Sequence, residues 1–283
     1  MQPVLARIRC LLPALTLIVA AYAQAQEIGA LTLLTDTPLR VIRGFSVLQG
    51  VEGMRLRQGD ILETGPSSTA QAQLEFSGGA IVELGPSTQV FLFGQSQTLS
   101  EIILLTGWLK GETTAGNYRY DSPLVIVTTK GGNVLLRAKE EEADAFVERG
   151  SASVTYGGGT PIVSSANKIF FTRRVAKPVM AADRPSPDFV SNMPLCFRDV
   201  LPSRLSRFAG KRPPEPKSSH DVSYAEIEPL LRLPLSWRRG LVGRFTPRLQ
   251  DRAFRQAIEA HIKDLPEWRP ILFPPATDKS DSR

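Results

Sequence analysis

Apolar and polar residues alternate strictly from Ala70 to Phe76, and the alternation resumes at Ala80 after the glycine pair Gly78-Gly79. Successive side chains of a β-strand point to opposite faces, so this period predicts a strand with one buried and one solvated face. Glycine accepts the positive φ angles of tight hairpin turns without steric cost. The segment therefore predicts a β-hairpin, with Gly79 in its turn.

Two further segments repeat this pattern of strand, glycine-containing turn and strand. They are residues 124–129 and 134–137 around the turn 130–133, and residues 145–148 and 152–156 around the turn 149–151. Short strands with turn signals every ~8–12 residues are typical of all-β sandwiches and barrels. We predict a mainly β fold: an antiparallel β-sandwich or jelly-roll-like domain over residues 26–172, with no long helix before residue 185.

The rest of the chain has a different pattern. Prolines at residues 177–187 and 211–217 predict a proline-rich, basic linker over residues 173–222, with a short helical segment between them. Ser223 and Glu226 form a capping box, and Asp251 precedes an apolar stripe of helical spacing at Phe254, Ile258 and Ile262. We predict a helical region over residues 223–270 and a disordered tail over residues 271–283.

The N-terminus has the layout of a secretory signal peptide. Arg7 and Arg9 precede an apolar run over residues 11–23, and small residues follow it. This run is shorter than the ~20 residues that cross a bilayer. We expect cleavage between Ala25 and Gln26, with cleavage after Ala23 as the alternative. We also expect a periplasmic or secreted location and no integral membrane span in the mature chain. The alternative is that the segment is retained as an anchor.

Charge is divided unevenly along the chain. Residues 26–172 carry 11 basic and 15 acidic side chains, whereas residues 173–283 carry 21 and 13. The sequence therefore predicts an acidic β-domain followed by a basic tail, although the whole chain has a net charge of +6. Export argues against nucleic acid as the partner of this tail.

Within residues 41–111 the chain resembles the FecR domain, named for a periplasmic iron-uptake regulator. The resemblance is carried by residues 56–65 (LRQGDILETG), 72–76 (AQLEF), 85–88 (GPST) and 105–109 (LTGWL). It implies an all-β extracytoplasmic module that contacts other proteins or the envelope and is not catalytic. The regulator also has a cytoplasmic anti-sigma segment and a transmembrane helix. Because a signal peptide stands in their place here, direct transcriptional signalling is not expected.

The motif residues admit a structural interpretation. We expect Gly59, Gly65, Gly79 and Gly107 to serve turns or close backbone approaches, and Asp60 to accept hydrogen bonds from turn amides, with Thr64 beside it. A ligand-binding role for these residues is the alternative. In the structural interpretation these side chains make contacts within the chain, whereas a ligand-binding role requires them to be available to another molecule.

Catalytic and metal-binding patterns are weak. The chain has two histidines and two cysteines, and it contains no nucleophile elbow, phosphate-binding glycine loop or histidine-based zinc spacing. We expect no enzyme activity and no cofactor or metal, and we interpret His220, His261 and Cys196 as solvated or packed. The acidic run at residues 140–144 is interpreted as a solvated loop, with a calcium site as the alternative.

Aromatic residues supply the remaining candidates. Trp108, Tyr118 and Tyr120 are interpreted as packing between strands, with a sugar-stacking surface as the alternative. The basic tail mixes aromatic residues with arginines in a way that is typical of surface binders. Its candidate interaction residues are Trp237, Arg238, Arg239, Arg244, Phe245 and Arg248.

Two roles are open for this tail. It binds an envelope protein or a cell-wall polymer such as peptidoglycan, or it docks on the acidic β-domain of its own chain. For the whole chain we expect a non-catalytic periplasmic interaction or sensing module, and the alternative is a protein that binds peptidoglycan or another anionic envelope surface through the basic tail.

Overall fold

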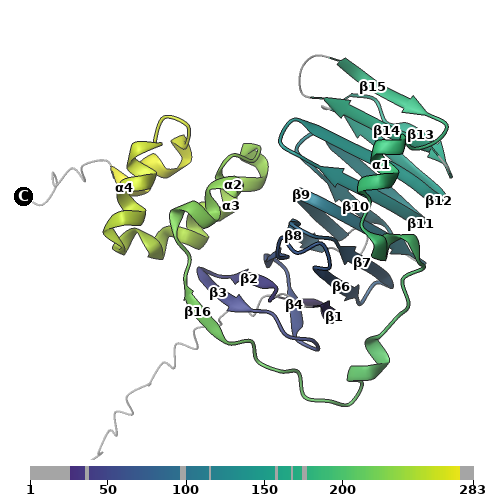
Figure 1. Ribbon diagram of the computed structural model, residues 1–283. Coiled ribbons are helices and arrows are strands. Elements are labelled where there is room, and N and C mark those ends of the chain that lie inside the picture. Colours follow the sequence, from purple (N-terminus) through teal and green to yellow (C-terminus); the bar gives the residue numbers. More distant parts are fainter. Residues whose placement is uncertain are drawn as a thin grey trace, which may run out of the picture.

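The computed structural model describes residues 26–274, apart from 36–37, 96–99, 115, 157–158, 167 and 174–176. This part of the chain is mainly β, as predicted (Figure 1). Its strands are β1 (Glu27–Thr35), β2 (Arg40–Arg43), β3 (Ser46–Gln49), β4 (Arg55–Arg57), β5 (Ile61–Glu63), β6 (Gln71–Phe76), β7 (Ala80–Leu84), β8 (Gln89–Gln95), β9 (Ser100–Thr113), β10 (Tyr118–Asp121), β11 (Val125–Ala138), β12 (Glu142–Tyr156), β13 (Ile162–Ser165), β14 (Lys168–Arg173), β15 (Lys177–Ala182) and β16 (Ser218–Asp221).

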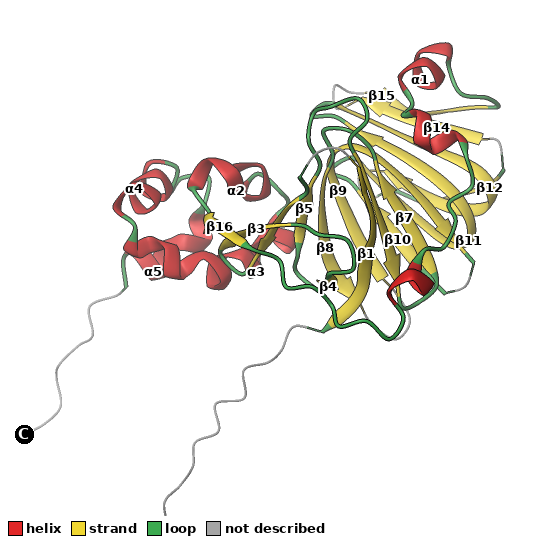
Figure 2. Cartoon of the chain, turned by 60° about the horizontal axis from the view of Figure 1, so that its bottom comes forward, coloured by secondary structure: helices red, strands yellow, loops and turns green. Residues whose placement is uncertain are grey.

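In the described chain all helices follow β15. They are α1 (Pro187–Asn192), α2 (Tyr224–Leu231), α3 (Leu235–Phe245), α4 (Arg252–Ala260) and α5 (Arg269–Leu272), with the 3-10 helices η1 (Leu195–Arg198), η2 (Leu205–Phe208), η3 (Thr246–Gln250) and η4 (Pro266–Trp268). Strands β1–β15 are called the β module below, residues 193–217 the strap, and residues 222–274 the cap. Figure 2 shows α2–α5 gathered on one side of the β module.

Strand β9 joins the two halves of the β module, which are the strands before it (β1–β8) and the strands after it (β10–β15). Up to Thr106 it pairs with β8, and its first residues pair in parallel with β10. From Gly107 onward it pairs with β11, and its last five residues also pair with β7. Both halves bury side chains in one central cluster, which includes Leu31, Leu74, Val127 and Leu136. The strands thus enclose a common core while remaining one hydrogen-bonded network.

Gly107 permits the change of partners along β9. Its φ angle is +92°, and a Cβ atom added there would lie 2.4 Å from Thr88 Oγ1 and 2.5 Å from Thr88 Cα. The Thr88 hydroxyl also accepts a hydrogen bond from the backbone N–H of Trp108 at 2.9 Å. A side chain at residue 107 would therefore strain the backbone and displace this contact.

Replacing Gly107 by alanine is expected to destabilise the fold by about 2–4 kcal/mol, because positive φ and backbone overlap act together. Urea unfolding followed by circular dichroism measures the effect. Gly240→Ala is the matched control: Gly240 lies in α3 with no atom within 4 Å of the added Cβ, and this change should be neutral or stabilise by about 0.5–1 kcal/mol. Equal effects of the two changes would contradict the role given to Gly107.

The hairpin predicted around Gly79 is present, since β6 and β7 pair across a turn in which Gly79 has φ of +86°. The two other predicted turns are wrong. Residues 130–133 and 149–151 lie inside the long strands β11 and β12, where Gly132 and Gly150 face each other and let the backbones approach closely. The β11–β12 turn lies at residues 139–142 and so includes the first part of the acidic run, residues 140–144, that was predicted to be a solvated loop. For Asp144 that prediction is wrong, because this residue is buried in β12 and pairs with Arg137.

The predicted linker is also partly wrong. Residues 177–182 form β15, which extends the sheet beyond β14, so the β module reaches past residue 172. The strap then runs around the β module from α1 to β16, as Figure 1 shows. Strand β16 pairs with β3 and thus joins the far edge of the sheet. A proline-rich composition had indicated a linker, but an edge strand tolerates proline because one of its sides needs no N–H donor.

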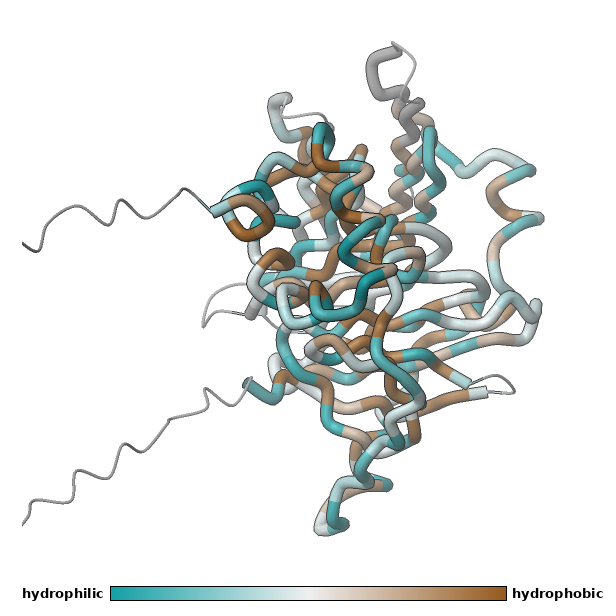
Figure 3. Tube along the Cα trace, turned by 90° about the vertical axis from the view of Figure 1, so that its left-hand side faces the viewer, coloured by the Kyte–Doolittle hydropathy of each residue, from teal (hydrophilic) through white to brown (hydrophobic). Residues whose placement is uncertain are grey.

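The segments after β15 cover outward-facing residues of the sheet. Ile42, Ile61 and Phe91 pack against cap residues such as Phe245 and Trp268. On another face, Leu135 and Ile169 pack against Phe189 and Phe197. Hydrophobic and hydrophilic stretches alternate along the chain trace (Figure 3). Burying an outer face as well as the core removes more apolar surface from water than one core alone.

Candidate functional site

Asp60 forms its hydrogen bonds within the fold. Its side chain is fully buried and accepts hydrogen bonds from Arg43 Nε at 2.9 Å, Arg43 Nη2 at 2.6 Å and the backbone N–H of Arg57 at 2.9 Å. The carboxylate therefore ties β2 to the turn that precedes β5. This geometry agrees with the structural interpretation of the motif.

The other motif residues also serve the backbone. Thr64 Oγ1 donates to the carbonyl of Gly85 at 2.6 Å and accepts from the N–H of Thr88 at 2.9 Å. The carbonyl of Gly65 accepts from Ser87 at 2.9 Å, and Gly59 has φ of +89°. These contacts hold the 85–88 segment against β5 and leave the Thr64 hydroxyl occupied.

Arg244 fastens the cap to the β module. Its guanidinium donates to three backbone carbonyls, from Nε to Gly44 at 2.6 Å, from Nη1 to Gly59 at 2.5 Å and from Nη2 to Ile42 at 2.7 Å. Burial lowers its pKa to about 10, although the nearby Asp60 charge acts in the opposite direction. Arg244 is thus still charged at neutral pH and lies within the interface.

The neighbouring candidate residues are used in the same way. Phe245 is fully buried, and Trp237 packs against the same cluster. Arg248 Nε donates to the carbonyl of Val222 at 2.8 Å, and Arg238 Nη1 donates to that of Leu231 at 2.7 Å. The structure therefore brings most of the predicted interaction residues into internal contacts of the cap. The sequence pattern does not distinguish docking within the chain from binding to another molecule.

The outer surface of the cap has a different character. Arg239, Arg252, Lys263 and Arg269 are exposed there and form no ion pair with any residue that the structure describes. Of the predicted interaction residues, Arg239 alone belongs to this set, which we call the free cations. Exposed apolar side chains lie on the same cap at Leu235, Ile271 and Phe273.

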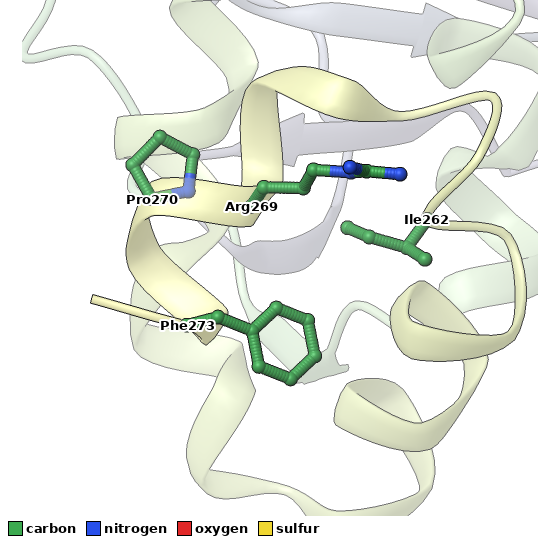
Figure 4. A pocket seen from close by; sticks show the side chains of 4 residues that line it. All are labelled: Ile262, Arg269, Pro270 and Phe273. Carbon is green, nitrogen blue, oxygen red and sulfur yellow. The ribbon is translucent and has the colours of Figure 1, made fainter. Parts of the chain in front are cut away.

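An open hollow of about 710 Å³ lies at the end of the cap. Its lining residues are Ile262, Arg269, Pro270 and Phe273. We call it the α5 hollow. Figure 4 shows the Arg269 side chain extending toward Ile262, with the Phe273 ring on the other side of the opening. The described lining residues other than Arg269 are apolar.

Sequence reasoning missed this hollow. Residues 271–283 were predicted to be a disordered tail, whereas α5 runs to Leu272 and the described chain continues to Pro274. The signal that was overlooked is Pro270, because proline is favoured in the first turn of a helix. Residues 275–283 lie outside the described residues.

Beneath the strap, the outward side chains of β6, β7 and β9 are polar and buried. Gln73 and Glu75 lie there, so the prediction that this hairpin has a solvated face is wrong. Glu75 accepts from Ser203 Oγ and the N–H of Arg204, both at 2.6 Å. Burial of these groups is offset by hydrogen bonds to the strap, as buried polar groups require.

Lys110 anchors the strap from the sheet side. Its ammonium group, 1% exposed, donates to the carbonyls of Phe197 at 2.7 Å and Asp199 at 2.9 Å and lies 3.1 Å from the carboxylate of Glu148. This satisfies the three donors of a buried ammonium group. The lysine therefore has a structural role.

Glu83 lies in the same polar layer and accepts a hydrogen bond from Gln71. Burial raises its pKa from 4.5 to about 7, against the lowering effect of the Lys110 charge. Burial and the Glu83 charge together raise the pKa of the Cys196 thiol to about 12. This agrees with the interpretation of Cys196 as packed rather than reactive, because the thiolate is the nucleophilic form.

The raised pKa of Glu83 predicts a pH-dependent stability. A carboxyl that binds its proton more tightly when folded contributes most below pH about 4.5, and this contribution is lost as pH rises to about 7, in total about 3 kcal/mol. Glu83→Gln should remove this dependence, as measured by urea unfolding at about pH 5 and pH 8. Glu27→Gln, at a mostly exposed site, should retain it. An unchanged pH slope in Glu83→Gln would contradict the prediction.

The aromatic and histidine candidates also have internal contacts. Tyr118 and Tyr120 are buried, and the Trp108 ring lies 5.1 Å from that of Phe189, so a sugar-stacking surface is contradicted. His261 stacks on Tyr224 with ring centroids 5.3 Å apart. His220 Nε2 lies 2.9 Å from the Glu226 carboxylate.

Within the described residues, no group of three or more His, Cys, Asp or Glu side chains is placed to hold a metal ion. In that same part of the chain, no helix is both long and apolar enough to span a bilayer. The predicted signal peptide and its cleavage site at Ala25 lie outside or at the edge of the described residues.

Comparisons with known proteins show no family. No family model matches the chain, and no curated protein matches it. Among solved structures, two crystal structures of a candidate anti-sigma factor from Parabacteroides distasonis ATCC 8503 are similar to it, each with a TM-score of 0.39 and 11% sequence identity. Each match covers 44% of this chain and 59% of that protein, less than two thirds of its length.

Proposed function

We propose that this chain is an exported, non-catalytic binding module, in which the β module is the scaffold and the outer cap surface contacts a partner protein. One observation carries this proposal. The cap arginines that face inward have acceptors within the chain, whereas the free cations are exposed on the cap, which also carries exposed apolar side chains. Protein interfaces are enriched in arginine and aromatic residues and combine apolar with polar contacts.

The scaffold role rests on how the motif residues are used. Asp60, Thr64 and the glycines of the FecR-like segment are engaged in hydrogen bonds or tight backbone conformations. The polar groups of Asp60 and Thr64 are therefore hydrogen-bonded within the chain. We place the contact with another molecule on the outer surface of the cap instead. The resemblance to an extracytoplasmic interaction domain agrees with this proposal.

Photocrosslinking in cells tests the proposal. A photoreactive residue in place of Arg239 or Lys263, on the outer cap, is expected to give protein adducts of discrete mass. The control position is Lys130, an exposed residue of β11. Adducts from Lys130 alone, or from none of the three positions, would overturn a cap-based protein interface.

Export is tested separately. Mass spectrometry of the extracytoplasmic chain is expected to show an N-terminus at Gln26. A chain that retains residues 1–25 in a membrane fraction would contradict cleavage and support an anchor.

The free cations also favour a second candidate, an anionic envelope polymer. Purified peptidoglycan should then retain the full chain at low salt and release it at high salt, because exposed charges are screened. Arg252→Glu and Lys263→Glu should weaken retention. Absence of binding at every salt concentration would remove this candidate.

A further inference from the structure

The α5 hollow combines features that point to one kind of occupant. Phe273 is 59% exposed, so a large apolar side chain is left in contact with water. Among the described lining residues only Arg269 is charged, and its guanidinium forms no ion pair with another described residue. Lys263 follows Ile262 in the sequence, and the exposed Asp264 follows Lys263, but neither residue lines the hollow. The described lining is therefore apolar apart from one guanidinium.

We infer that the α5 hollow binds an acidic segment of a partner protein, with an apolar side chain of that segment in the hollow and a carboxylate on Arg269. This rests on the proposed function and names the partner class. A planar guanidinium pairs with a carboxylate through two parallel hydrogen bonds, which fixes the orientation of the bound segment. Pro270 and Phe273 supply the apolar contact area.

The shape and charge of the site favour a protein over a lipid surface. A hollow accepts a protruding side chain, whereas a bilayer presents a broad surface to which amphipathic helices apply a continuous apolar face. Here Ile262, Pro270 and Phe273 surround an opening (Figure 4). The α4 face that bears Phe254 and Ile258 is already buried inside the cap. The Arg269 guanidinium in the lining complements an acidic segment and disfavours a basic one.

Occupancy of the hollow should leave the rest of the fold unchanged. The Arg244 contacts and the strap contacts of Lys110 belong to other parts of the chain. Replacing Arg269 or Phe273 on the surface should therefore leave thermal melting near that of the parent protein. This makes the site testable by substitution in the full chain.

The test measures binding of fluorescein-labelled peptides to the full chain by fluorescence anisotropy. The probe peptide has glutamates flanking one phenylalanine and one leucine. A second peptide replaces glutamate with lysine, and a third replaces the two apolar residues with serine. The probe peptide alone should bind well. Arg269→Glu and Phe273→Ser should each weaken its binding about tenfold or more.

Arg252→Glu is the matched control, because Arg252 is also an exposed free cation but does not line the hollow. It should change binding by about twofold or less, since an exposed charge outside the contact is screened by solvent and salt. Equal losses in Arg269→Glu and Arg252→Glu would overturn the inference, as would equal binding of the lysine peptide. Binding only to vesicles containing phosphatidylglycerol would show a lipid surface instead.

The two proposals fail in different ways. If crosslinks form from the outer cap in cells but Arg269→Glu neither reduces them nor affects the probe peptide, the α5 hollow is not the contact and the binding-module proposal stands. If no crosslink forms from the outer cap, the proposed function itself fails.

Discussion

Replacing Asp60 by alanine is expected to destabilise the protein by about 3–5 kcal/mol. The change leaves the Arg43 guanidinium, which is mostly buried, without its carboxylate and removes an acceptor from the Arg57 amide. An uncompensated charge in a buried position costs more than the pair contributes when intact. Thermal and urea unfolding measure the loss.

Two comparisons make the Asp60 result specific. Asp183→Ala removes an exposed carboxylate that pairs with Lys168 and should leave the melting temperature nearly unchanged. In the double variant Arg43→Ala, Asp60→Ala, the loss should be smaller than the sum of the single losses, because the two groups form one buried unit. Unaltered melting of Asp60→Ala would show that this residue is not part of the scaffold.

Replacing Arg244 by alanine is expected to loosen or release the cap. The partly buried carbonyls of Ile42 and Gly59 and the exposed carbonyl of Gly44 would lose this donor. An acceptor left unpaired costs about 1–3 kcal/mol when it is buried and less when water reaches it. We expect a total loss of about 2–4 kcal/mol in the free energy that holds the cap to the β module, because only the carbonyls of Ile42 and Gly59 are partly buried. Urea unfolding and limited proteolysis of the cap measure it.

The control for Arg244 lies on the same helix. Arg239→Ala removes an exposed arginine of α3 and should leave both stability and proteolysis nearly unchanged. Arg244→Lys should be intermediate, because one ammonium group replaces a planar donor that reaches three carbonyls at once. If the protease cleaves the cap of Arg244→Ala at the rate of the parent protein, Arg244 does not hold the cap to the β module.

The sequence predicts local structure well where a residue or pattern favours only one local conformation. Strict alternation at residues 70–76 gave a strand, and Asp251 caps α4 by accepting from the amides of Ala253 and Phe254. Glycine is ambiguous, because it serves both turns and close approaches of extended strands. Gly79 lies in a hairpin turn, whereas Gly132 and Gly150 lie inside long strands.

Contacts between segments that are distant in the sequence could not be predicted from it. Gln73 and Glu75 have the spacing of a solvated strand face, and only the path of the strap shows that they are buried. The same holds for the tail arginines, because Arg244 and Arg239 look alike in the sequence and lie in opposite environments. The α5 hollow was missed because it depends on a short helix whose residues have no periodicity.

The return of the C-terminal segments to the first strands also bears on folding kinetics. Strand β16 pairs with β3, and Arg244 reaches the carbonyl of Ile42 across 202 residues of sequence. Contacts of such long range slow folding, because the chain must close large loops before they form. During synthesis the outer face of β2, β5 and β8 stays uncovered until nearly the whole chain exists. A chain that ends before α3 should therefore expose Ile42, Ile61 and Phe91 and aggregate.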